Sequence, residues 1–166
     1  MKELERESDR GCALAAASYL DDKLRQLLQA RMVQHSAVDD LLENPDGLRT
    51  FSVRTNLAFV LGIISREVFS DLNRIRDIRN SFGHILELRR FTHPTVVHVC
   101  NSLENMLEDL LLKRRRLSAP RTRFVKSVMA IETIFECSLA QSKRPGANRK
   151  TELESLDYWK DLLTNL

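Results

Sequence analysis

Apolar residues recur every three or four positions over most of this chain, which is the spacing of one face of an α-helix. The clearest example lies in the middle of the chain, where one stripe contains Leu72, Ile75, Ile78 and Phe82. Ser65 precedes this stretch and is a favoured N-cap residue. The pattern therefore predicts a central helix from about Arg66 to His84 or a little beyond.

Other stretches with the same spacing predict further helices, over residues 4–33, 38–42, 51–61, 95–112, 121–142 and 151–166. Ser36 is the expected N-cap of the short second one, and Pro94 can occupy the first turn of the helix near Thr95. Gly62 is expected to end the helix 51–61, because glycine is common just after a helix C-terminus. Residues 44–47 are predicted to form a turn, and residues 142–149 a loop.

Small side chains between Gly11 and Ala17 would let a second helix approach the N-terminal helix closely. In the helix 51–61 the core candidates are Phe51, Leu57, Val60 and Leu61. The sequence therefore predicts an all-α protein, a bundle of about six to seven helices with the long N-terminal helix packed on the central helix 66–84. Residues 1–166 are expected to form one domain.

Composition agrees with one helical domain. The 166 residues are 43% apolar, with five glycines and four prolines. Three cysteines, far apart and without a Cys-x-x-Cys pair, argue against a disulfide framework or a zinc site and suit a reducing cytoplasm. Acidic residues near the N-terminus argue against a signal peptide, and no apolar run reaches the roughly 18 residues of a membrane span. We expect a cytoplasmic protein.

Charge is unevenly distributed. Residues 113–150 contain eleven Lys and Arg against two Glu, a net charge of +9. Because the whole chain has a net charge of +3, the remaining residues carry −6. Such a basic segment can bind nucleic acid, although a solvated basic helix face is the commoner explanation. The candidate phosphate contacts are Lys113, Arg114, Arg115, Arg116, Arg121, Arg123 and Lys126. Because no helix-turn-helix pattern is evident, sequence-specific reading of a DNA groove is poorly supported.

Polar residues of the central helix are the main candidates for chemistry. Arg76, Asn80 and His84 are four residues apart and share one side of a helix, whereas Arg79 lies about 140° from His84. Arginine can hold a phosphate and histidine can transfer protons near neutral pH, a combination suited to phosphodiester cleavage. The alternative is structural, with Asn80 and His84 bonded to a neighbouring loop. No metal-ligand spacing or glycine-rich phosphate loop is present, so no metal or cofactor is expected.

Several motifs together resemble the mannitol operon repressor family of bacterial transcriptional regulators. The matching residues are Ser8-Asp-Arg-Gly-Cys-Ala13, Phe51-Ser-Val-Arg54, Leu61-Gly-Ile-Ile-Ser65, Asp71-Leu72-Asn73 and Ile75-Arg-Asp-Ile-Arg-Asn-Ser-Phe-Gly-His84. The resemblance covers about residues 7–110. Gly83 departs from the family, which commonly has a slightly larger residue there. The resemblance implies an all-helical regulator without a recognised DNA-binding motif, one that would act through a protein partner.

A second, shorter resemblance is confined to the central helix. The spacing from Arg79 to His84 is similar to the Arg-x(4–6)-His signature of HEPN domains, helical bundles that often dimerise and in some branches cleave RNA without metal. That resemblance implies Arg79 and His84 as a catalytic pair across a homodimer, with Asn80 as a polar helper.

Two hypotheses follow. In the first, the protein is a mannitol-operon-repressor-like regulator that binds a protein partner; in the alternative, it is a HEPN-like ribonuclease or RNA-binding protein. The candidate binding residues are Arg54, Arg76, Arg79, Asn80 and His84. No membrane association is expected.

Overall fold

The computed structural model describes residues 4, 6–33, 35–44, 47–84, 90–104 and 119–142. Every regular element in this part of the chain is an α-helix. In chain order the helices are α2 (Asp9–Gln29), α3 (Ser36–Glu43), α4 (Phe51–Val60), α5 (Arg66–His84), α6 (Pro94–Asn101) and α8 (Pro120–Ser142). The predicted all-α bundle is confirmed.

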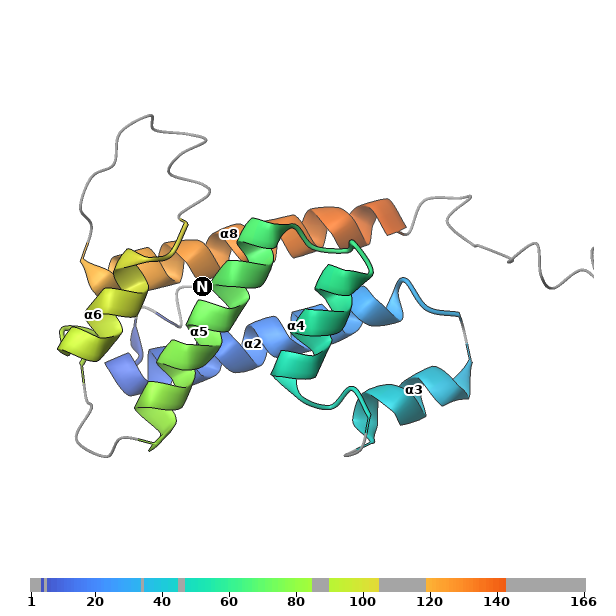
Figure 1. Ribbon diagram of the computed structural model, residues 1–166, viewed down its shortest axis with the longest axis horizontal. Coiled ribbons are helices and arrows are strands. Elements are labelled where there is room, and N and C mark those ends of the chain that lie inside the picture. The colour runs from blue at the N-terminus through green and yellow to red at the C-terminus, as the bar shows by residue number, and fades with distance from the viewer. Residues whose placement is uncertain are drawn as a thin grey trace, which may run out of the picture.

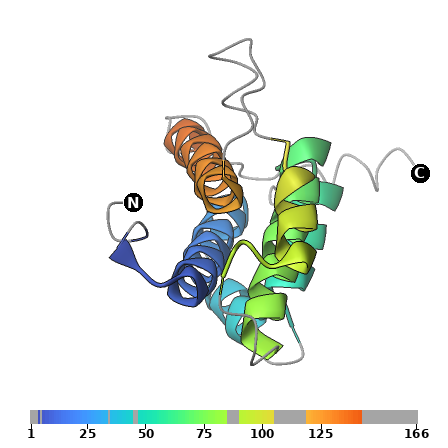
Figure 2. The ribbon, with the colours of Figure 1, turned by 90° about the vertical axis from the view of Figure 1, so that its left-hand side faces the viewer.

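The helices form two layers. The two longest, α2 and α8, run side by side along the molecule, and α4, α5 and α6 lie against them on one side (Figures 1 and 2). Helix α5 contacts α2, α4, α6 and α8, so it occupies the centre of its layer. The predicted packing of the N-terminal helix on the central helix is therefore confirmed.

The predicted apolar stripe of α5 forms the middle of the core. Leu72, Ile75, Ile78 and Phe82 are fully buried. The ring of Phe82 lies 5.0 Å from that of Phe91, which lies 5.1 Å from that of Phe124 on α8. This chain of aromatic rings joins the two layers.

Small residues of α2 allow the close packing that their sequence predicted. Cys12, Ala13 and Ala16 are fully buried and Ala17 nearly so, on a helix that contacts α4, α5 and α8. Alanine and cysteine side chains keep the helix axes close together. The leucines that follow in α2 occur at helical spacing (i, i+4, i+7 and i+8) and are fully buried in the core: Leu20, Leu24, Leu27 and Leu28.

Several helix ends differ from the prediction. Helix α2 begins at Asp9 rather than near Leu4, because the Ser8 hydroxyl accepts the Gly11 N–H at 3.0 Å and caps the first turn. It stops at Gln29 rather than Val33, although no breaker occurs there, and tight turns then lead the chain toward α3. The N-cap of α3 is His35 rather than Ser36, since Nδ1 of His35 accepts the Ala37 N–H at 3.1 Å.

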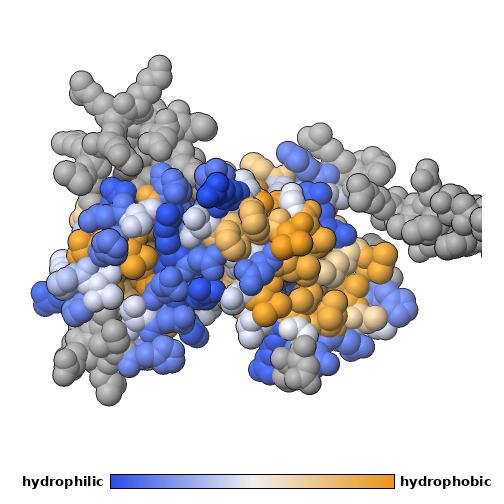
Figure 3. Space-filling model, viewed as in Figure 1, coloured by the Kyte–Doolittle hydropathy of each residue, from blue (hydrophilic) through white to orange (hydrophobic). Residues whose placement is uncertain are grey.

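The orientation of α4 corrects part of the predicted core. Its buried face contains Arg54, Thr55 and Ala58, whereas Val60 and Leu61 are 79% and 56% exposed. Apolar residues occur on both sides of this helix, so their spacing could not decide which side faces inward. The exposed apolar residues gather over α4, beside the mostly hydrophilic surface of α5 (Figure 3).

Glycine ends α4 as predicted. Gly62 has φ of +66°, which residues with a Cβ rarely adopt. The Ile63 N–H then donates to the Ala58 carbonyl at 2.8 Å and the Gly62 N–H to the Phe59 carbonyl at 2.9 Å, as in a Schellman motif. The resulting tight turn sets the start of α5, where the Ser65 hydroxyl accepts the Val68 N–H at 3.4 Å, consistent with its predicted capping role.

Some predicted segments lie outside the described residues. Helix α6 ends at Asn101, followed by Ser102 as its C-cap, rather than continuing as predicted to Leu112, of which residues 105–112 are not described. The predicted loop beyond Ser142 and the predicted last helix, residues 151–166, are likewise outside the described part.

Candidate functional site

The candidate residues of α5 lie along its solvent-facing side, here called the polar edge of α5 and defined as Arg76, Arg79, Asn80 and His84. Arg76 is the most constrained of them. Its Nη1 donates to the Ser52 hydroxyl of α4 at 2.8 Å, and its Nη2 pairs with Asp77 at 3.4 Å. Arg76 therefore joins α5 to α4 while one side of its guanidinium faces outward.

Arg79 and Asn80 form a pair on the surface. Nη1 of Arg79 donates to Oδ1 of Asn80 at 3.0 Å, and the Arg79 side chain is exposed. The amide oxygen holds the guanidinium in one orientation, which lowers the entropy lost when a partner binds it. The pair presents N–H donors suited to a carboxylate or a phosphate.

His84 lies in the last turn of α5 and is exposed. No described residue donates to or accepts from its imidazole, so the expected bond to a neighbouring loop is not present among the described residues. Beside it Gly83 has open space where a Cβ would lie, and the Gly83 carbonyl accepts from Arg10 at 3.3 Å. The Arg10 guanidinium thus sits at the C-terminal, partially negative end of the helix, where a cation is favourable.

One copy of the chain does not bring Arg79 and His84 together on a common target. They are five residues apart on a regular helix, which directs them about 140° apart. A phosphodiester held by Arg79 would reach His84 only from the flank or from a second copy. The polar edge of α5 by itself is suited to binding.

Arg54 is not at the polar edge. Its guanidinium is buried between α2, α3 and α4, where Nη1 donates to Asp21 at 2.8 Å and Nη2 to the Leu42 carbonyl at 3.0 Å. Burial raises the pKa of the Asp21 carboxyl, and the hydrogen bond from Arg54 offsets part of this rise. The structure therefore places Arg54 in the interior, where it joins three helices.

Two of the candidate nucleic-acid contacts are engaged within the protein. Arg121 donates to Asp9 at 2.6 Å and to the Leu4 and Glu7 carbonyls at 2.9 and 2.6 Å. Arg123 donates to carbonyls at and just after the C-terminal end of α6: Cys100 at 3.2 Å, Asn101 at 3.3 Å and Leu103 at 3.4 Å. Both guanidinium groups hold the ends of neighbouring segments in place.

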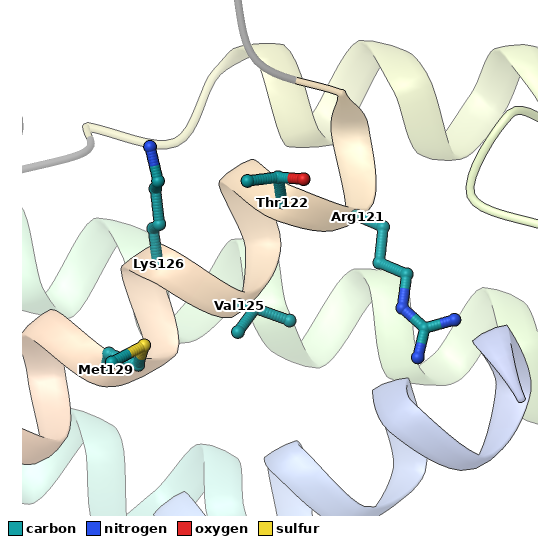
Figure 4. Close-up of a pocket in the computed structure, with 5 residues that line it drawn as sticks. All are labelled: Arg121, Thr122, Val125, Lys126 and Met129. Atoms are coloured by element: carbon teal, nitrogen blue, oxygen red, sulfur yellow. The ribbon is translucent and has the colours of Figure 1, made fainter. Parts of the chain in front are cut away.

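Lys126 borders an open pocket of about 310 Å³ on α8, lined by Arg121, Thr122, Val125, Lys126 and Met129. Figure 4 shows the Arg121 guanidinium turned toward the start of α2, while Lys126 points to the opposite side of α8. The two basic groups therefore do not converge on one ligand. The remaining candidates, Lys113, Arg114, Arg115 and Arg116, lie outside the described residues.

The sequence analysis missed the role of Asp71. Its carboxylate is fully buried, where it accepts Arg74 at 2.8 Å and the Glu104 N–H at 3.1 and 3.2 Å. Burial raises the pKa of Asp71, while the Arg74 guanidinium and the Glu104 N–H offset part of the rise. Asp71 joins α5 to the segment after α6. The sequence signal that could have revealed this role is the position of Asp71 directly before Leu72, at the border of the apolar stripe of α5.

The ranges that the structure describes also bear on metal binding and membrane insertion. In these ranges no group of three His, Cys, Asp or Glu side chains is placed to hold a metal ion. None of the described helices is long and apolar enough to cross a membrane.

Comparison with known proteins gives one family and one informative structure. The model of the mannitol repressor family matches residues 4–135. A solved structure, described as the X-ray structure of the MtlR–HPr complex from Escherichia coli, has a similar chain with a TM-score of 0.60 and 22% identity. The similarity covers 80% of this chain and 94% of that one, so the two share a fold. A search of curated proteins found no match.

Proposed function

This chain belongs to the mannitol repressor family, and we propose that it is a transcriptional regulator that acts by binding a protein partner. The observation that carries the proposal is the solved complex, in which a chain of the same fold is bound to HPr. HPr, or a protein like it, is the partner that we propose here. Binding of HPr would change how much of this protein is free to act on its target genes, and so would control their transcription.

The basic residues of α8 support a protein partner over direct binding of DNA. An arginine that binds a DNA phosphate must offer its N–H donors to the phosphate oxygens. Arg121 and Arg123 instead donate to Asp9 and to five main-chain carbonyls of their own chain. Releasing them would leave those acceptors unpaired.

The polar edge of α5 is the proposed contact surface. Arg79 and His84 are exposed, and the Asn80 amide orients Arg79. Arginine is enriched among the residues that dominate binding energy at protein interfaces. Its partner would present a carboxylate or main-chain carbonyls to this guanidinium.

A binding experiment tests this surface. Titration calorimetry with HPr from the same organism is expected to give saturable binding, and Arg79→Ala to weaken it about tenfold or more, as for a central interface arginine. Arg25→Ala is the matched control, because Arg25 lies away from the polar edge of α5 and pairs with Asp22 on α2 and Glu43 on α3. The affinity of this variant for HPr should equal that of wild type. If wild type binds and Arg79→Ala binds equally well, the polar edge is not the interface. If wild type does not bind, HPr is not the partner.

The exposure of His84 favours a second candidate function, RNA cleavage by a dimer. His84 is exposed, and a general base or acid must be able to reach the group whose proton it transfers. Two copies could bring Arg79 of one to His84 of the other, with Asn80 orienting the arginine.

Incubation of the purified protein with RNA under a metal chelator tests this candidate. Cleavage by wild type and its loss in His84→Ala are the expected results, with His98→Ala as the control because His98 is an exposed histidine on α6. No cleavage by wild type, or equal cleavage by wild type and His84→Ala, would remove the catalytic role.

A further inference from the structure

Helix α3 lies at the edge of the molecule, outside the two layers (Figure 1). Of its eight residues only Val38 and Leu42 are buried. Neither of them belongs to the contiguous cluster of buried apolar residues that forms the main core. Helix α3 therefore adds no side chain to the core that holds the other helices together.

Two of the polar contacts of α3 lie at the surface. Nε2 of Gln29 donates to Oδ1 of Asp39 at 2.8 Å, and the Arg25 guanidinium lies 3.6 Å from the Glu43 carboxylate. Both pairs join the C-terminal half of α2 to α3. Solvent-exposed pairs of this kind add little stability, because water competes for the same groups. These two contacts alone would hold α3 only weakly.

The buried polar contact of α3 is made by Arg54 of α4. Its Nη2 donates to the Leu42 carbonyl at 3.0 Å, while its Nη1 donates to Asp21 of α2 at 2.8 Å. The Nε–H of the same guanidinium is buried without an acceptor among the described residues. A buried donor without an acceptor destabilises the conformation that buries it. Departure of α3 would let water reach Nε and Nη2 and would leave the ion pair with Asp21 in place.

Helix α3 also depends on the bundle for its own backbone hydrogen bonds. It has eight residues, whereas isolated helices shorter than about 12–15 residues are marginal in water. When α3 leaves the bundle, its backbone N–H groups therefore become free to exchange with solvent. Opening of α3 and unfolding of the core can be followed separately, because they expose different amides.

We propose that α3 is a flap that opens as a unit while α2, α4, α5, α6 and α8 stay folded. In the closed form the Leu42 side chain and the hydrogen bond from Arg54 hold the flap on the bundle. In the open form the ion pair of Arg54 with Asp21, which joins α4 to α2, becomes accessible to solvent. The flap is independent of the proposed partner surface, because it includes no residue of the polar edge of α5.

Native-state hydrogen exchange of the full-length protein tests the flap. The amides of residues 40–43 are expected to exchange at least about a hundredfold faster than the slowest amides of α2 and α5, since a local opening needs less free energy than global unfolding. Low concentrations of urea should accelerate the slowest amides of α2 and α5. They should leave the α3 amides nearly unchanged, because a small opening exposes little surface.

Two variants separate a flap from a part of the core. Leu42→Ala should bring the α3 amides close to the exchange rate of an unstructured peptide and leave those of α2 and α5 unchanged. Ile75→Val, a mild change at a fully buried position of the main core, should accelerate the slowest amides of α2 and α5 severalfold and leave α3 unchanged. The proposal is overturned if the α3 amides of wild type exchange as slowly as those of α2, or if either variant changes all helices by the same factor.

Discussion

Replacing Phe82 with alanine is expected to destabilise the protein by about 3–5 kcal/mol, the usual cost of truncating a buried aromatic ring. The Phe82 side chain is fully buried, and its ring joins α5 to Phe91 and through it to α8. Movement of one neighbour is not expected to fill the cavity, because the ring belongs to a chain of three aromatic rings that joins both layers of the bundle. Urea unfolding followed by far-ultraviolet circular dichroism measures the loss.

Met129→Ala is the control for this prediction. Its side chain is 40% exposed on the outer face of α8, so a loss below about 1 kcal/mol is expected. A similarly small loss for Phe82→Ala would show that α5 is not the centre of the core.

Arg54→Met is expected to cost about 3 kcal/mol, as when one partner of a buried ion pair is removed. Methionine can fill much of the volume, but it leaves the Asp21 carboxylate and the Leu42 carbonyl without the donors now 2.8 and 3.0 Å away. Thermal or urea unfolding measures the loss, and Arg25→Met, at a more exposed pair, should cost less than about 1 kcal/mol.

The stability that Arg54→Met loses relative to wild type is expected to depend on pH in one direction. Burial already raises the pKa of Asp21, and loss of Arg54 removes the hydrogen bond that offsets this rise. The folded-state pKa of Asp21 is then still higher in the variant, so the variant gains stability relative to wild type as pH falls through that pKa. The stability difference should therefore narrow on acidification; a constant or widening difference would exclude Asp21 as the group left unpaired.

The centre of the fold could be predicted because α5 has one apolar side. Its stripe, its start after Ser65 and its end at His84 all follow from local patterns. The orientation of α4 could not be predicted, because apolar residues occur on both of its sides and only tertiary packing chooses between them. The end of α2 at Gln29 has no local signal either, since the chain turns there to reach α3.

The positions of the candidate residues in the fold could be predicted only in part, and their role in binding stays a prediction. Within the polar edge of α5, Arg76, Asn80 and His84 are four residues apart on one helix, so they share a side whatever the rest of the chain does. Arg54, Arg121 and Arg123 have partners far away in sequence, and nothing local distinguishes an arginine that binds a distant carbonyl from one that faces solvent. Because these arginines bind groups of their own chain, we propose a protein partner rather than nucleic acid.

Parallel equilibrium titrations of the full-length protein with HPr and with DNA upstream of the genes that it is proposed to regulate test the central proposal most directly. We predict saturable binding of HPr of defined stoichiometry and no comparable affinity for DNA. Each titration is repeated at two salt concentrations, because phosphate contacts lose affinity steeply as salt rises. Tight DNA binding that falls steeply with salt, together with no HPr complex, would contradict the proposal that this protein regulates transcription through a protein partner.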